Sequence, residues 1–172
     1  MEMKPKLLVS ACLLGQPVRY DGQAKPLSEQ DWRRLRQKFD LIAACPECMG
    51  GLPTPRPPAE LRGGDGTAAL RGQAGVITAT GEDVSAAFID GAGQALGLAQ
   101  AHGCRQALLK ANSPSCGSRR IYDGRFSGTL KDGEGVTASL FRQAGIVVCS
   151  EEDIDVLLDA PSRQAAQQSE FS

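Results

Sequence analysis

Short apolar runs alternate along the chain with longer amphipathic or alanine-rich segments. Four runs have the length and composition of buried strands, at residues 6–10, 41–44, 106–110 and 146–149. Helical patterns occupy residues 28–39, about 84–102, 135–143 and a short segment that starts near 150. Strands that alternate with helices in this way predict an α/β fold with a mainly parallel sheet.

Capping signals support these helix boundaries. The segments SEQD (28–31), TGED (80–83) and SEED (150–153) each place a hydroxyl residue ahead of acidic residues, a frequent helix start. Gly103 follows the alanine-rich segment, where a left-handed glycine commonly ends a helix. We therefore expect a Rossmann-like sheet with helices on both of its faces.

Three stretches do not fit the alternation. Residues 50–79 are rich in Gly and Pro and predict a functional flap, with a short edge strand at 76–78. Residues 121–135 predict a hairpin or a glycine-punctuated loop. The polar segment 161–172 predicts a disordered tail. The expected organisation is one domain over residues 1–160 followed by this tail.

Charge and hydropathy exclude several classes of partner. With 19 basic and 20 acidic residues, the net charge of −1 gives no electrostatic basis for binding duplex nucleic acid or an anionic membrane. No apolar run approaches the roughly 18 residues of a membrane span, and the N-terminal residues lack the apolar core of a signal peptide. We expect a cytoplasmic protein.

Three of the six cysteines follow predicted strands: Cys12, Cys45 and Cys116. In a parallel sheet their thiols meet at one edge, where open α/β sheets build their sites. Disulfides are rare in the cytosol, and soft sulfur ligands select iron–sulfur clusters among other metal centres. A cubane held by three cysteines leaves one iron open as a Lewis acid. The alternative is that all three are ordinary packing or loop residues.

Cys45 and Cys48 form a C-x-x-C pair, which also suggests half of a zinc site or a redox pair. Zinc lacks partners, because the sequence has no second such pair and its only histidine, His102, is expected at a helix end. A redox pair needs a helix N-terminus, and residues 49–53 make a poor helix start. A metal-binding or thiol-redox sensing module without catalysis is the alternative to an enzyme.

Polar residues near these cysteines have the chemistry that a reaction needs. Glu47 is expected to be partly buried and to serve as general acid or base. Ser113 precedes a proline, which holds its backbone extended, and its hydroxyl can position a water or a carbonyl. Lys110 ends a strand and can balance the charge of bound sulfur. Their ordinary interpretations are a solvated glutamate, a turn serine and a surface lysine.

Taken together, the motifs resemble one family. They are SACLLG (10–15), CPE (45–47), GGLP (50–53), PRPPAE (55–60), Lys110 with SPSCG (113–117), IYDGRFSG (121–128) and GVTA (135–138). In this order they extend the resemblance from about residue 6 to residue 158. The chain is identified as a member of the family of small bacterial iron–sulfur proteins that includes the thiouracil desulfidases, formerly grouped only as a domain of unknown function.

The resemblance implies an oxygen-sensitive 4Fe-4S cluster on three cysteines, with its fourth iron open to take the sulfur of a thiolated pyrimidine such as thiouracil. Water oxygen then replaces sulfur without net redox change. By motif position, the implied ligands are Cys12, Cys45 and Cys116, the implied acid/base is Glu47, and the implied active-site serine is Ser113.

The resemblance further places Lys110, Arg56 and Tyr122 in the substrate pocket, with a small thiolated base or nucleoside as the expected substrate. One position departs from the family pattern. Residue 48 is generally not cysteine, so Cys48 is either a spare thiol near the cluster or a small apolar residue. Cys104 and Cys149 match no ligand position and are expected in the core.

Overall fold

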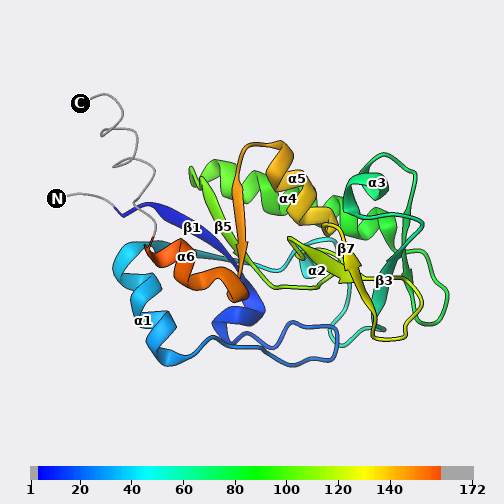
Figure 1. The fold of residues 1–172 in the computed structure, drawn as a ribbon, viewed down its shortest axis with the longest axis horizontal. Helices are drawn as coiled ribbons and strands as arrows, with labels where there is room; N and C mark the ends of the chain where they lie inside the picture. The colour runs from blue at the N-terminus through cyan, green and yellow to red at the C-terminus, as the bar shows by residue number, and fades with distance from the viewer. Residues whose placement is uncertain (1–3, 160–172) are drawn as a thin grey trace.

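A parallel sheet forms the centre of the molecule (Figure 1). The computed structural model describes residues 4–159, and the predicted tail at 161–172 lies outside them. Within this part of the chain, four strands pair in the order β2-β1-β5-β8. Their bounds are β1 Lys6–Ser10, β2 Asp40–Ala44, β5 Gln106–Leu109 and β8 Val147–Ser150. Every pairing is parallel, which confirms the predicted α/β class and places each strand within a residue of its expected position.

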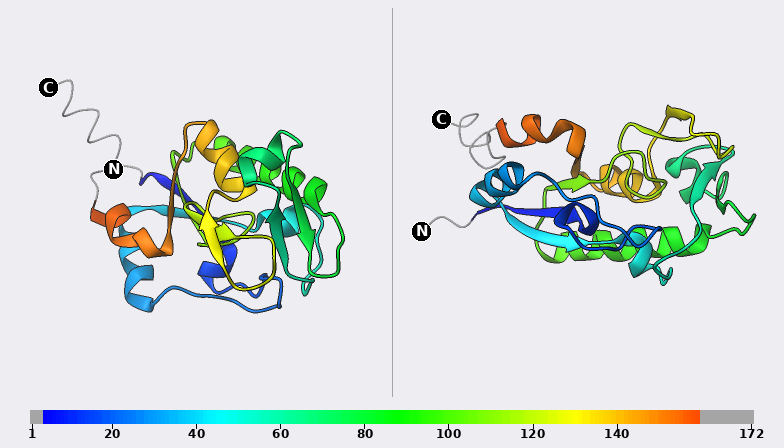
Figure 2. Two further views of the ribbon diagram at one scale, coloured as in Figure 1. Left: turned by 45° about the vertical axis from the view of Figure 1, so that its right-hand side comes forward. Right: turned by 90° about the horizontal axis from the view of Figure 1, so that it is seen from below.

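Helices cover both faces of the sheet (Figure 2). They are α1 (Glu29–Lys38) and α6 (Ile154–Asp159) on one face, and α4 (Ser85–Ala101) and α5 (Val136–Gln143) on the other. Alternation along β1 explains the two layers, because successive side chains of a strand point to opposite faces. Leu7 and Val9 pack in the cluster with Leu35 of α1, whereas Leu8 packs with Ala95 of α4. The prediction of helices on both faces is confirmed.

Most of the predicted helix caps are present. The Ser28 hydroxyl accepts a hydrogen bond from the Asp31 N–H (3.2 Å), and Gly103 has a left-handed φ of 68° just after α4. Ser150 caps the short 3₁₀ turn η2 (Glu151–Asp153). The expected cap at 80–83 is wrong, because Val84 is the N-cap residue of α4 and makes no side-chain cap bond. The hydroxyl of Thr78 instead accepts from the Glu82 N–H, so this segment forms a turn.

The region 50–79 contains more regular structure than the sequence predicted. Strands β3 (Ala59–Arg62) and β4 (Gly75–Thr78) pair antiparallel, with the short helix α3 (Gly66–Leu70) between them. The expected strand at 76–78 therefore exists, but it pairs with β3 and not with the central sheet. Leu61 and Val76 are fully buried beside Phe88 of α4, and this third apolar cluster holds the region on the domain.

The predicted hairpin near 121–135 is also present. Strands β6 (Arg120–Tyr122) and β7 (Leu130–Asp132) pair antiparallel, and β6 contacts β3. The remaining elements are two single turns at the edge of the main sheet, η1 (Ala11–Leu14) after β1 and α2 (Pro46–Met49) after β2. Among the described residues, no helix is both long and apolar enough to cross a membrane.

Helix α2 packs directly on the backbone of α4, and two glycines permit this contact. A Cβ atom added to Gly91 would lie 1.8 Å from the Pro46 carbonyl oxygen, and one added to Gly50 would lie 2.0 Å from that of Ala87. Real Cβ atoms do not approach other atoms so closely. The position of α2, and with it that of Cys45, therefore depends on the absence of a side chain at these two sites.

We predict opposite effects for two alanine substitutions in α4. Gly91→Ala forces α2 away from α4 and should lower the free energy of unfolding by about 2 kcal/mol or more, as overpacking does. Gly93→Ala meets no atom within 4 Å and should raise it by about 0.5–1 kcal/mol, because alanine is the better helix former. Chemical denaturation of both variants measures the difference. Shifts of the same sign would contradict the proposed close contact.

Candidate metal centre

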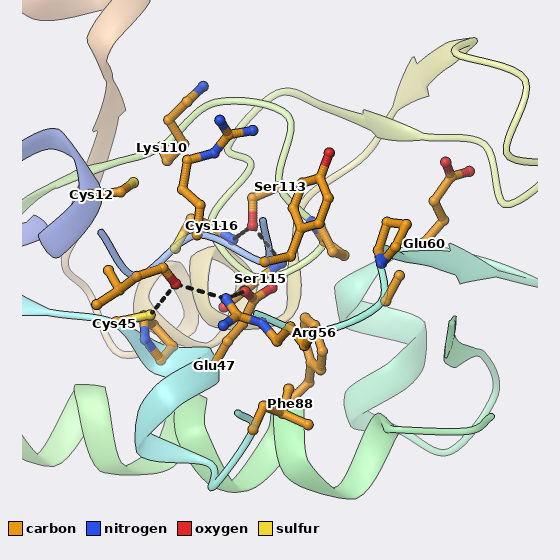
Figure 3. A pocket seen from close by; sticks show the side chains of 18 of the residues that line it. Cys12, Cys45, Glu47, Arg56, Glu60, Phe88, Lys110, Ser113, Ser115 and Cys116 are labelled. Carbon is orange, nitrogen blue, oxygen red and sulfur yellow. Dashed lines mark hydrogen bonds and ion pairs between the residues drawn. The ribbon is translucent and has the colours of Figure 1, made fainter. Parts of the chain in front are cut away.

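The three cysteines that follow predicted strands line one cavity of about 660 Å³ (Figure 3). Cys12 lies in η1 after β1, Cys45 directly follows β2, and Cys116 lies in the loop after β5. The cavity opens at the point where the connections between strands change face. The connection that leaves β1 contains α1 and covers one face of the sheet, whereas the connection that enters β5 contains α4 and covers the other. Such a switch point is where open α/β sheets bind ligands. The predicted convergence of the three cysteines on one edge is therefore found.

Cys12 is held by the turn that ends β1. Its carbonyl oxygen accepts hydrogen bonds from the N–H groups of Gly15 (3.2 Å) and Lys25 (3.0 Å), so the turn and the following loop close around it. Cys12 as a whole is 8% exposed. Burial raises its pKa above the ordinary value, while the positive charges of Lys110 and Arg19 act in the opposite direction.

Cys45 is the N-cap residue of the single helical turn α2, which corrects the expectation that this motif makes a poor helix start. Pro46 occupies the first helical position, where its missing N–H costs nothing, and Gly51 ends the turn with a φ of 90°. Burial nevertheless raises the pKa of the Cys45 thiol to about 12. A redox dithiol requires a lowered pKa, so the structure disfavours that interpretation.

Cys116 is the most enclosed of the three thiols, and its burial raises its pKa to about 12. The Ser10 hydroxyl donates to its sulfur at 3.5 Å, and the same hydroxyl accepts from the Lys110 N–H at 2.9 Å. Ser113 shapes the turn, because its Oγ accepts from the N–H groups of Ser115 (3.0 Å) and Cys116 (3.1 Å). The turn-forming interpretation of Ser113 is thus correct, and its oxygen also lines the cavity.

The Cys116 loop is fastened to the start of α5. The N–H groups of Val136 and Thr137 donate to the carbonyl oxygens of Pro114 and Ser115, both at 2.8 Å. These bonds satisfy helix N–H groups that have no partner inside the helix. Gly135 makes the contact possible, since a Cβ atom there would lie 2.5 Å from the Ser115 carbonyl. The loop geometry therefore follows from a helix more than 20 residues further along the chain.

Glu47 projects from α2 into the cavity and forms an ion pair with Arg56. The Arg56 side chain is only 5% exposed, and its guanidinium also donates to the carbonyl oxygen of Val18 at 3.0 Å and to the Thr54 hydroxyl at 3.1 Å. The pKa of Arg56 is raised despite desolvation, because the Glu47 carboxylate stabilises its charge. Arg56 therefore joins three segments of the cavity wall, a role that its motif alone did not indicate.

Lys110 and Tyr122 also line the cavity, as expected from their motifs. Lys110 forms an ion pair with Glu151 at 2.6 Å, and the other oxygen of Glu151 accepts from the Ala111 N–H at 2.7 Å. From the sequence, Glu151 is expected only as part of a helix cap. Its position directly after β8, at the same edge of the sheet, is the signal that could have identified it.

Two more cavity residues escaped prediction, Glu60 and Phe126. They belong to the PRPPAE (55–60) and IYDGRFSG (121–128) motifs, but their importance depends on a hydrogen bond between residues 66 positions apart. Only the structure marks Glu60: its side chain belongs to a residue that is 9% exposed, and glutamates are rarely buried without partners.

Cys48 does not line the cavity with the three predicted ligands. Its sulfur lies 3.5 Å from the Thr54 hydroxyl and 3.9 Å from the Val18 carbonyl oxygen. The Cys45 sulfur lies 3.8 Å from the same carbonyl oxygen. Cys104 is buried in the apolar cluster on one face of the sheet, and Cys149 packs against the cluster on the other face, so both belong to the core as expected. All six cysteines lie within the described residues and are free thiols.

The donor set fits a cluster better than a single metal ion. Among residues 4–159, no three His, Cys, Asp or Glu side chains gather closely enough to hold one ion. Three thiols around a cavity of this volume suit a larger sulfur-ligated group, because iron–sulfur clusters take cysteine thiolates. Thiols must lose their protons to bind, so the positive charge of the metal has to offset the burial that raises their pKa values.

Comparisons with known proteins identify the family of this chain. The uncharacterized protein YbbK of Bacillus subtilis (strain 168) is 44% identical over 152 residues, which span 88% of this chain and 99% of the relative. The solved structure of the 4Fe-4S-dependent thiouracil desulfidase TudS is 52% identical, with a TM-score of 0.80 over 90% of this chain and 95% of that one. The family model described as 2-thiouracil desulfurase matches residues 7–153, which include every strand end that carries a cavity cysteine, and the chain therefore belongs to this family.

Proposed function

We propose that this protein removes the sulfur of a thiolated pyrimidine such as thiouracil and replaces it with the oxygen of water. The observation that carries this proposal is the convergence of three thiols from three strand ends on one cavity. It is supported by 52% identity to a 4Fe-4S-dependent thiouracil desulfidase. In the overall reaction, the C=S group and water give a C=O group and hydrogen sulfide, so no electrons enter or leave.

The residues that would hold a 4Fe-4S cluster are Cys12, Cys45 and Cys116. When bound, the cluster supplies one iron without a protein ligand, a Lewis acid with affinity for the substrate sulfur. Cys48 lies outside the cavity, which supports three protein ligands over four. The Ser10 hydroxyl, which donates to the Cys116 sulfur, would stabilise that ligand as a thiolate.

Glu47 is the group that would move protons. Its carboxylate lines the cavity, and Arg56 orients it from the side. In this arrangement Glu47 can accept a proton from the attacking water and later return it to the departing sulfur. Arg56 is buried and engaged with Glu47 and the Val18 carbonyl, so we assign it to positioning Glu47 more than to direct contact with substrate.

Ser113 and Lys110 would orient the substrate. The two backbone N–H groups that bind Ser113 Oγ occupy its lone pairs, so its hydroxyl acts toward a molecule in the cavity as a donor. A carbonyl oxygen or thiocarbonyl sulfur of the base is a suitable acceptor. Lys110, held by Glu151, would add positive charge near Cys12, and Tyr122 would form part of the wall.

An open iron reacts with oxygen, and we infer that the protein works in the reducing cytoplasm. The free thiols of its cysteines are consistent with such a compartment. The substrate is a small base or nucleoside, because the cavity has room for such a molecule beside the thiols and the chain has no excess of basic residues that would favour a nucleic acid. A sensing module without catalysis would not need Glu47 and Ser113 beside the thiols, so the geometry favours the enzyme.

We predict that anaerobically prepared protein carries about four irons per chain and releases sulfide from 2- or 4-thiouracil with formation of uracil. Sulfide assay and chromatography of the pyrimidine measure both products. Protein without cluster, from the same preparation, serves as control. A protein that holds the cluster but releases no sulfide from any thiopyrimidine would refute the substrate assignment.

Replacing any one of Cys12, Cys45 or Cys116 by serine should abolish the cluster, because two thiolates and a hard hydroxyl hold iron–sulfur groups poorly. Cys48→Ser is the matched control, since it changes the neighbouring thiol of the same C-x-x-C pair, and should keep full iron and sulfide content. Metal analysis and visible absorbance of anaerobic samples separate the two results. Loss of iron in Cys48→Ser would instead indicate four protein ligands.

Glu47→Gln should preserve the cluster and lower kcat by a factor of about 10² to 10⁴, the usual contribution of a positioned acid or base. The amide oxygen can still accept from Arg56, so the wall of the cavity should stay intact. Glu152→Gln, at an exposed position, is the control and should retain normal turnover. Wild-type kcat in Glu47→Gln would remove this residue from the proton-transfer role.

A further inference from the structure

Glu60 is a buried carboxylate on the side of the cavity opposite Cys12 (Figure 3). It belongs to β3, and its Oε1 atom accepts hydrogen bonds from the N–H groups of Gly124 (3.0 Å) and Phe126 (3.1 Å). Both donors belong to the segment 123–129, here called the β6–β7 loop. One carboxylate oxygen thus holds two backbone groups of a loop that lies more than 60 residues away in sequence.

Two further contacts fasten the same loop to β3. Arg62 donates to the Gly124 carbonyl oxygen at 3.2 Å. Gly124 packs so closely on the strand that an added Cβ atom would lie 2.7 Å from the Leu61 carbonyl oxygen. The backbone from Gly124 to Phe126 is therefore held against β3, while Ser127 and Gly128 beyond it are exposed.

The backbone at Phe126 is strained. Its φ is +54°, a left-handed conformation that a residue with a bulky side chain rarely adopts. Within the described part of the chain, only Asn112 and Phe126 among non-glycine residues have positive φ, and both line the cavity. Strain of this kind persists only where the surroundings impose it, and it concentrates at functional sites. Here the bond from the Phe126 N–H to Glu60 helps to impose it.

We propose that Glu60 is a positioning residue that holds the aromatic ring of Phe126 at the cavity as the surface on which the planar substrate ring packs. This inference rests on the proposed function and deepens it. Aromatic side chains bind nucleobases by stacking, which tolerates different ring substituents. Phe126 is half-buried and lines the same cavity as the three thiols, so a base stacked on it shares that cavity with them.

The proposal separates binding from chemistry. The thiols, Glu47 and Ser113 belong to η1, to α2 with its N-cap residue, and to the loop after β5, whereas Phe126 belongs to the β6–β7 loop. Loss of the tether should therefore weaken substrate binding and leave the reacting groups in place. Glu60→Ala and Phe126→Leu should each raise KM about tenfold while kcat stays within about twofold. Glu60→Gln, whose amide oxygen can accept the same two N–H groups, should restore most of the loss.

Cleavage by trypsin tests the tether of the β6–β7 loop without a measurement of catalytic activity. Arg125 is exposed and lies between the two tethered N–H groups, so cleavage after it reports release of the loop. With anaerobic, cluster-loaded protein and cleavage sites identified by mass spectrometry, Glu60→Ala should be cut after Arg125 several times faster than wild type. Phe126→Leu should be cut at a rate close to wild type, because its backbone keeps the Glu60 bond. Added 2-thiouracil should slow the cleavage of wild type and not that of Phe126→Leu.

The outcomes are distinguishable. Unchanged cleavage in Glu60→Ala would overturn the tether, and equal protection of Phe126→Leu by 2-thiouracil would overturn the stacking role. A wild type that releases no sulfide would refute the proposed function, while the protection experiment would still decide whether Phe126 contacts the base. A parallel fall of kcat and iron content in Glu60→Ala would show a general structural role and contradict the proposal.

Discussion

The parallel hydrogen-bond ladder that joins β1 to both β2 and β5 is the constraint on which the site depends. It pairs Ser10 with Ala44 and Val9 with Leu108, so the carboxyl ends of the three strands lie side by side at one edge of the sheet. The chain leaves each of these ends as a turn or loop that carries one of the cavity cysteines. Three thiols spread over more than 100 residues thereby line a single cavity. A shift of register in either ladder would move one of them away.

Close backbone contacts then determine where each thiol lies. Gly91 lets the turn that carries Cys45 rest on α4, and Gly135 lets the Cys116 loop rest on the start of α5. The same enclosure makes the thiols poor acids, with pKa values raised to about 12 for Cys45 and Cys116. A cavity of this kind disfavours free thiolates and suits a group whose own positive charge offsets the desolvation.

The polar residues of the site are already oriented by partners before any substrate is bound. Glu47 is paired with Arg56, Lys110 with Glu151, and Ser113 with two backbone N–H groups. Such groups lose little freedom during a reaction, which is the physical basis of preorganised catalysis. The ordinary and the functional interpretations of Ser113 are therefore compatible, because the hydroxyl that forms the turn is also presented to the cavity.

The amino-acid sequence by itself determined the strands, the main helices and the cysteines that follow strands, because these depend on local periodicity, capping residues and motif order. It predicted the strand at 76–78 but did not indicate its pairing with β3, because β3 has only four residues and directly follows a proline-rich run. Nor did it indicate the bond from Glu60 to Phe126 or the pair of Glu47 with Arg56. These contacts were decided by the tertiary structure alone, since a hydrogen bond between distant segments depends on how the whole chain packs and leaves no periodic signal in either segment.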